Sequence, residues 1–205
     1  MKIVDIDTWN RKELYNHFIR LKDPYFGVVI PFDVTKAYDY AKGQKISFFA
    51  QYLHSCMKAV NEVDNFRYRI IDNKVVDYDV IHASATIMRE DKTFGFSFIN
   101  YDEDLDVFIN NLKKEKIRIQ NSYDLYPPVN SQDCIHCSAL PWFKFSGHKE
   151  PVSGIMDSVP KIAFSKAEKS NGKLMMNVSI NVNHALVDGY HVGLFEEKFQ
   201  FNLNT

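Results

Sequence analysis

The sequence predicts a mixed α/β fold, in which helices pack against a central β-sheet. Segments with the period of a strand are interspersed along the chain with segments that have the period of an amphipathic helix. The 205 residues are 45% hydrophobic and 14% aromatic, a composition that suits a well-packed globular protein. No repeat or Pro/Gly/Ser-rich linker divides the chain, so we expect a single domain over residues 1–205.

Helices are predicted in four segments. The first runs from residue 9 to about residue 21, with Asp7 or Thr8 as its cap. Ser47 can cap the second helix, whose apolar residues recur at helical spacing. Its expected core residues are Phe48, Phe49, Leu53, Met57 and Val60. A third helix begins near residue 102 and carries acidic residues before basic ones, the order that the helix dipole favours. The last begins near Tyr190.

Strands are predicted where apolar and polar residues alternate between turn signals. They cover residues 26–32, 66–71, 74–81, 84–88, 93–100, 133–140, 160–166 and 173–183. Asp72-Asn73 is typical of a hairpin turn, and residues 168–172 join the last two strands. This order of elements indicates one sheet with helices on it.

The last predicted strand leads into the candidate catalytic residue, His184. Its even positions from 174 to 182 are apolar, whereas polar residues at positions 177, 179, 181 and 183 form a face that is wet or lines a cavity. A histidine at the end of a rigid strand keeps one orientation while its imidazole stays accessible. Its ordinary pKa of about 6.5 suits proton transfer near neutral pH.

Two other interpretations of His184 remain open. A single histidine beside an apolar strand is often purely structural. His184, Asp188 and His191 have the spacing of one helical face and could bind a metal, although Gly189 indicates a turn rather than a continuous helix. We expect no metal site.

Four motifs resemble those of one enzyme family. The segment His184-Ala185-Leu186-Val187-Asp188-Gly189 resembles the active-site signature of the chloramphenicol acetyltransferase family, within the coenzyme A-dependent acyltransferase superfamily. More distantly, it resembles the acyltransferase domains of 2-oxo-acid dehydrogenase complexes. The segment Trp9-Asn10-Arg11-Lys12-Glu13 is similar to the family's Trp-x-Arg-x-Glu helix, and Phe66-Arg67 to its Phe-Arg pair. Ser138-Ala139-Leu140-Pro141-Trp142 is similar to its Ser-Ala-x-Pro-Trp strand end.

The resemblance implies a two-layer sandwich and direct acyl transfer. His184 would take a proton from the hydroxyl of an acceptor, which attacks the thioester carbonyl of acetyl-CoA without a covalent enzyme intermediate. Ser138 would donate a hydrogen bond to the negative charge that develops on the carbonyl oxygen. Asp188 would pair with Arg11 rather than complete a Ser-His-Asp triad, and this pair fixes the geometry around His184 if it is substantially buried.

The acceptor pocket combines features of the family with departures from it. Phe18 stands where the family has a tyrosine that contacts chloramphenicol, and Phe94 and Phe96 suit an apolar pocket wall. Ala163 stands where a family threonine helps to order the acceptor, and Asn183 replaces the first histidine of a His-His pair. These changes remove polar contacts and keep apolar ones, so chloramphenicol is a plausible acceptor.

Charge constrains the partners. The net charge of -1 gives no electrostatic reason to expect nucleic acid or an anionic membrane. The resemblance places Lys45 and Lys166 near the phosphate of coenzyme A. Acidic residues precede any apolar run of signal length, and no stretch reaches the roughly 20 apolar residues of a membrane span, so we expect a cytoplasmic location.

The cysteines do not indicate redox or metal chemistry. Cys56, Cys134 and Cys137 are an odd number, which does not suit a disulfide framework. Strand alternation would send Cys134 and Cys137 to opposite faces, where they cannot share a disulfide or a metal. We expect buried, reduced thiols.

The leading hypothesis is an acetyl-CoA-dependent O-acetyltransferase of the chloramphenicol type, the activity that confers resistance to that antibiotic. One alternative keeps the fold and the base but uses another hydroxyl acceptor, and a second is a non-catalytic ligand-binding relative in which His184 is structural. The resemblance also implies a homotrimer with sites between subunits. His184 would come from one subunit, and Phe18, Phe94 and Ser138 from its neighbour.

Overall fold

A computed structural model of the protein describes residues 1–151 and 157–205. Its elements are, in order, β1 (Lys2–Ile3), α1 (Lys12–Phe18), β2 (Tyr25–Asp33), α2 (Thr35–Gly43), α3 (Phe48–Asn61), α4 (Asp64–Arg67), β3 (Tyr68–Ile71), β4 (Lys74–Asp77), β5 (His82–Met88), β6 (Phe94–Phe96), α5 (Leu105–Gln120), β7 (Cys134–Leu140), β8 (Lys161–Ser170), β9 (Lys173–Asn183) and α6 (Gly189–Asn204).

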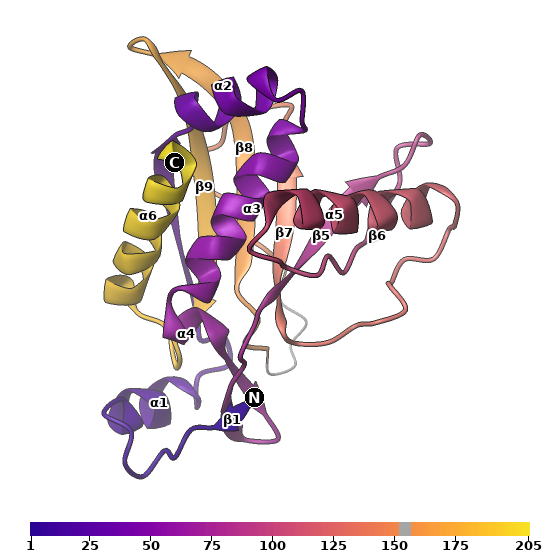
Figure 1. The fold of residues 1–205 in the computed structure, drawn as a ribbon. Helices are drawn as coiled ribbons and strands as arrows, with labels where there is room; N and C mark the ends of the chain where they lie inside the picture. The colour runs from indigo at the N-terminus through magenta and orange to yellow at the C-terminus, as the bar shows by residue number, and fades with distance from the viewer. Residues whose placement is uncertain (152–156) are drawn as a thin grey trace.

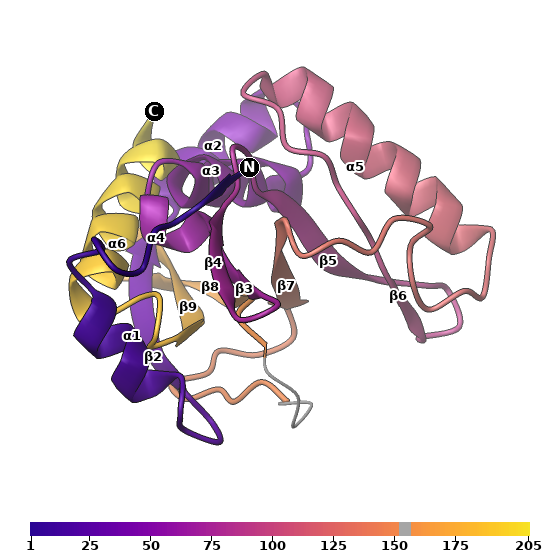
Figure 2. The same cartoon turned by 90° about the horizontal axis from the view of Figure 1, so that it is seen from below.

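The main sheet is mixed and carries helices on one face. Within the described residues it has the strand order β2-β9-β8-β7-β5-β6, with β5, β7 and β8 parallel and the other neighbours antiparallel. The helices α2, α3, α5 and α6 lie on the same side of it (Figure 1, Figure 2). The predicted mixed α/β, two-layer architecture is therefore confirmed. None of the helices in the described ranges has the length and apolarity needed to cross a membrane.

The core fills the space between the helices and the sheet. Leu53 of α3, Phe164 of β8 and Phe199 of α6 are at most 1% exposed. Full burial of a large apolar side chain contributes about 1.5–3 kcal/mol to folding. This packing fixes α3 and α6 against β8 and β9, and β9 leads directly to the candidate site.

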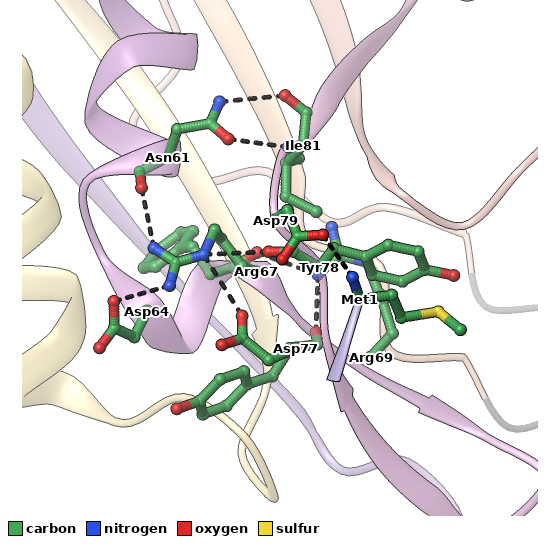
Figure 3. Close-up of polar contacts among 11 residues, drawn as sticks. Met1, Asn61, Asp64, Arg67, Arg69, Asp77, Tyr78, Asp79 and Ile81 are labelled. Carbon is green, nitrogen blue, oxygen red and sulfur yellow. Dashed lines mark hydrogen bonds and ion pairs between the residues drawn. The ribbon is translucent and has the colours of Figure 1, made fainter. Parts of the chain in front are cut away.

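A second, small sheet contains the predicted hairpin. Here β3 and β4 pair through the turn at Asp72 and Asn73, both at positive φ, as a tight hairpin turn requires, and β1 adds a third strand. The expectation that the hairpin belongs to the main sheet is wrong. Phe66 and Arg67 lie in α4 rather than in a strand. The reason is that Arg67 donates to the carbonyl oxygens of Asn61 and Tyr78 and pairs with the carboxylates of Asp64 and Asp77 (Figure 3).

Helix boundaries follow local hydrogen bonds. Ser47 accepts a hydrogen bond from the backbone N–H of Ala50, so the predicted cap of α3 is confirmed. Asp104 accepts from two backbone N–H groups and starts α5. The first helix is shorter than expected, because residues before Arg11 form turns. The unexpected α2 buries only Ala37 and Ala41, and such small side chains leave a weak periodic signal.

One face of the main sheet is polar. Strand registers align Ser84, His136, Lys161 and Asn181 in one row across β5, β7, β8 and β9. Ser138, Ala163 and Ser179 form the next row. We call these two rows the polar sheet face. The opposite side of β9 packs into the core, with Met176, Val178, Ile180 and Val182 at most 1% exposed, which confirms the predicted alternation.

Candidate active site

His184 follows β9 directly and is held by aromatic packing. Its backbone N–H donates to the carbonyl oxygen of Pro24 at 2.8 Å. Its imidazole stacks on the ring of Phe18, with centroids 3.9 Å apart and planes 7° apart, and the centroid of the Phe26 ring lies 4.6 Å away. The Nδ1 atom is buried and has no hydrogen-bond partner among the described residues. Packing against two rings therefore orients the imidazole.

Asn183 shapes the turn that presents His184. Its Oδ1 atom accepts from the N–H of Ala185 and its Nδ2 atom donates to the carbonyl oxygen of Asp157, both at 2.9 Å. Its own carbonyl oxygen accepts from the N–H of Leu186 at 3.0 Å. The amide of Asn183 thus ties the end of β9 to the segment before β8.

Arg11 and Asp188 form the predicted ion pair. The Nη1 atom of Arg11 contacts Oδ2 of Asp188, and the two side chains are 9% and 26% exposed. Asp188 also caps α6 by accepting from the N–H of Tyr190 at 3.0 Å, and its Oδ1 lies 2.9 Å from Nδ1 of His191. Burial raises the pKa of Asp188, but the hydrogen bond from Arg11 and the interactions with His191 outweigh it, so this pKa lies below its ordinary value. The pair ties α1 to the loop after His184.

The metal hypothesis required His184, Asp188 and His191 to converge. His191 contacts Asp188, whereas His184 stacks on Phe18. Among the residues that the structure describes, no group of three or more His, Cys, Asp or Glu side chains is arranged to hold a metal ion.

Ser138 lies in β7 on the polar sheet face, opposite Ala163 of β8. It lines a cavity of about 440 Å³ together with Phe96. The ring of Phe94 lies 5.6 Å from that of Phe96 and is exposed beside this cavity. The structure therefore brings Ser138 and Phe96 into one cavity, and Phe94 packs beside Phe96 without lining it. We call this cavity the Ser138 cavity.

His184 and Ser138 are far apart within one chain. Ser138 aligns through Ala163 with Ser179, five residues before His184 on β9. Standard strand spacings then put their Cα atoms about 20 Å apart. The expected division of the site is wrong for Phe18, because this residue stacks on His184 of its own chain. The reason is topological: β2 follows α1 and pairs with β9, which holds the end of α1 beside the end of β9.

A second cavity, of about 650 Å³, lies between α2, α3 and the β8–β9 hairpin. Lys166 lines it, with its Nζ atom 3.3 Å from the carboxylate of Glu168. Lys45 is exposed just after α2 and is not one of the lining residues. Three lining lysines were missed in the sequence: Lys42, Lys169 and Lys173. Lys169 and Lys173 stand at the two ends of the β8–β9 turn, and this clustering of basic residues in the sequence could have identified both.

The cysteines are buried, free thiols, as the sequence predicts. Burial raises the pKa of Cys134 to about 12, so this thiol stays protonated near neutral pH.

Comparison with known proteins agrees with these motifs. The sequence profile of the family described as "Chloramphenicol acetyltransferase" matches residues 1–200. A chloramphenicol acetyltransferase of Bacillus pumilus is 28% identical over 196 residues, which are 93% of this chain and 88% of that protein. A solved chloramphenicol acetyltransferase structure superposes with a TM-score of 0.90 at 28% identity and covers 98% of this chain and 99% of that one.

The fold alone is shared more widely. The cubic core of the pyruvate dehydrogenase multienzyme complex superposes with a TM-score of 0.68 at 14% identity, covering 100% of this chain and 90% of that one. The profile of the family matches nearly the whole chain, and the motifs lie as described above. The chain therefore belongs to the chloramphenicol acetyltransferase family.

Proposed function

We propose that this protein is an O-acetyltransferase that transfers the acetyl group of acetyl-CoA to a hydroxyl of a small acceptor, with His184 as the general base. The observation that carries the proposal is the fixed imidazole of His184, which stacks on Phe18 and packs against the tilted ring of Phe26 directly after β9. Chloramphenicol is the first acceptor to test, because the relatives carry its name.

The proposed reaction is one direct transfer. His184 takes the proton of the acceptor hydroxyl, and the resulting oxygen nucleophile attacks the thioester carbonyl carbon. The hydroxyl of Ser138 donates a hydrogen bond to the oxyanion of the tetrahedral intermediate. When the intermediate collapses, the carbon–sulfur bond breaks and the protonated imidazole returns a proton to the departing thiolate. Asp188 and Arg11 position the loop after His184 and do not touch the reacting atoms.

We place the coenzyme A in the cavity that Lys166 lines. An ammonium group suits a phosphate as a charge partner, and four lysines contribute to this cavity. Because Lys45 does not line this cavity, it would contact only the part of the cofactor that lies outside the cavity. We propose no metal in the reaction.

We also propose that the active protein is a homotrimer of single-domain chains, located in the cytoplasm. Because His184 and Ser138 lie about 20 Å apart by strand spacing, one chain cannot bring both to one acceptor. A site between two subunits solves this: His184 and Phe18 of one copy would face Ser138, Phe94 and Phe96 of the next.

The test is acetyl-CoA-dependent release of free thiol with a panel of hydroxyl compounds that includes chloramphenicol. We expect His184→Ala to lower turnover by about 10²- to 10⁴-fold, the usual cost of losing a general base. Folding should survive, since the hydrogen bond from residue 184 to Pro24 uses the backbone. Near-normal turnover in the folded variant would refute the mechanism, and no thiol release with any acceptor would favour a non-catalytic ligand-binding relative.

A further inference from the structure

Lys161 is a buried cation in the Ser138 cavity. It lies on the polar sheet face at the start of β8, between His136 of β7 and Asn181 of β9, and is 7% exposed. Lysine is among the residues that are almost never buried without a partner. Its side chain also lines a smaller adjoining cavity of about 250 Å³, so it stands where two cavities meet.

Protein groups surround the ammonium group of Lys161. Its Nζ atom lies 2.8 Å from a carboxylate oxygen of Asp157 and 4.6 Å from the centroid of the Tyr25 ring, and it is 3.4 Å from the carbonyl oxygen of Pro151. Asp157 accepts a 2.9 Å hydrogen bond from the N–H of Val159, and its carbonyl oxygen accepts from Asn183. The Lys161 and Asp157 side chains are 8% and 22% exposed. Protein atoms thus fix both members of the pair.

The pair lies within reach of an acceptor bound at Ser138. Lys161 is two residues before Ala163, the partner of Ser138, and shares its face of β8. Strand spacings put the Cα atoms of Lys161 and Ser138 about 8 Å apart, roughly the length of one sugar ring with its substituents. The rings of Phe96 and Tyr126 line the same cavity and lie 5.6 Å apart.

We propose that Lys161 and Asp157 determine the acceptor, and that they favour a hydroxyl-rich molecule of the sugar class over chloramphenicol. The inference rests on the proposed acetyltransferase function. Neighbouring hydroxyls can accept from the ammonium group and donate to the carboxylate, while the aromatic rings pack against the C–H face of the molecule. The pair is neutral as a unit, so the acceptor needs no net charge.

The physical reason is desolvation. An apolar ring seated over a charge pair removes water and replaces none of its hydrogen bonds. A site built to hydrogen-bond several neighbouring hydroxyls therefore discriminates against an acceptor that has fewer of them to offer. Chloramphenicol has two hydroxyls, and with one of them at His184 as the acceptor it has only one left for Lys161 and Asp157.

The experiment compares kcat/KM for a set of monosaccharides and for chloramphenicol, with acetyl-CoA in excess. We expect the wild-type protein to prefer at least one sugar by tenfold or more. In Lys161→Met this preference should fall at least tenfold, because kcat/KM drops for the sugar and stays equal or rises for chloramphenicol. Lys114→Met, at an exposed position on α5, is the matched control and should change neither value.

A second variant keeps the test valid if Lys161→Met does not fold. Lys161→Met/Asp157→Asn removes both charges and keeps an acceptor for the N–H of Val159, so it leaves no unpaired carboxylate. Equal losses for all acceptors in either folded variant would overturn the inference. So would a tenfold preference of the wild-type protein for chloramphenicol over every sugar, whatever the variants do. Absence of thiol release with all acceptors would instead refute the acetyltransferase function itself.

Discussion

The side chain of Asp188 makes three contacts near the candidate base. Its carboxylate pairs with Arg11, caps α6 and meets the imidazole of His191. Burial lowers the pKa of His191, although the charge of Asp188 opposes this. The Nδ1 atom of His191 also lies 3.2 Å from the backbone nitrogen of Asp188. Arg11 is the more deeply buried partner, and it would be left without a counter-charge if Asp188 were neutral.

We therefore predict that Asp188→Asn lowers the free energy of unfolding at pH 7 by about 1–3 kcal/mol, because it leaves a buried guanidinium unpaired. Asparagine still caps the helix, so cap loss does not contribute. Urea unfolding measures the change. Asp7→Asn, which breaks the exposed pair with Lys12, is the control and should cost far less. Equal costs for the two variants would contradict the assignment.

The same variant should change the pH dependence of stability. The pKa of Asp188 is lower in the folded protein than the unfolded value of about 3.9. Its contribution is therefore complete above about pH 3.9 and is lost as the pH falls through the folded pKa. Stability curves of wild type and Asp188→Asn should converge in acid. If the two curves stayed parallel from pH 7 to pH 2, folding would not lower the pKa of Asp188, contrary to this prediction.

At the scale of elements, a buried arginine joins the small sheet to the main one. Arg69 of β3 is 0% exposed and donates to four backbone carbonyl oxygens, including those of Gln132 and Cys134 at the start of β7. Burial lowers the pKa of Arg69 to about 10, which still leaves it charged at neutral pH. Strand β7 carries Ser138, so this link positions the candidate oxyanion donor.

We predict that Arg69→Met destabilises the protein by about 3 kcal/mol or more, because buried acceptors left without donors cost about 1–3 kcal/mol each. Thermal unfolding with a matched Arg20→Met control, at an exposed position after α1, measures the effect. Arg69→Lys should recover only part of the loss, since an ammonium group cannot span four carbonyls with the geometry of a guanidinium. A wild-type melting temperature in Arg69→Met would rule out this role.

At the scale of the whole molecule, the candidate catalytic groups occupy two separate regions. His184 and Phe18 lie at the β2 edge of the main sheet, whereas Ser138 and Lys161 lie on its polar face. The proposed homotrimer would bring the two regions together.

Mixing two inactive variants tests this arrangement. After dissociation and reassembly, His184→Ala and Ser138→Ala chains should form some interfaces that carry both intact groups, and activity should rise well above either parent. Reassembly of each variant alone is the control and should restore nothing. A fully active monomer, identified by light scattering together with the assay, would exclude shared sites.

Local sequence signals were sufficient for most elements. Ser47 and the helical spacing after it predicted α3, and Asp72-Asn73 predicted the hairpin, because a cap and a tight turn depend on a few neighbouring residues. The short α2 was missed, since its buried face consists of Ala37 and Ala41. The sheet to which the hairpin belongs was also mistaken, because pairing between distant strands leaves no local pattern.

The periodicity of the sequence by itself predicted the mixed α/β architecture. Its motifs, by their resemblance to one family, predicted that family, the candidate residues and the pair of Arg11 with Asp188. Only the tertiary structure decided how those residues group: Phe18 with His184, and Ser138 with Phe96 and the buried Lys161. The physical reason is that strand register and packing between distant segments set these neighbours. Two residues on the same face of a strand look alike in sequence, whether their side chains meet a helix, a cavity or another subunit.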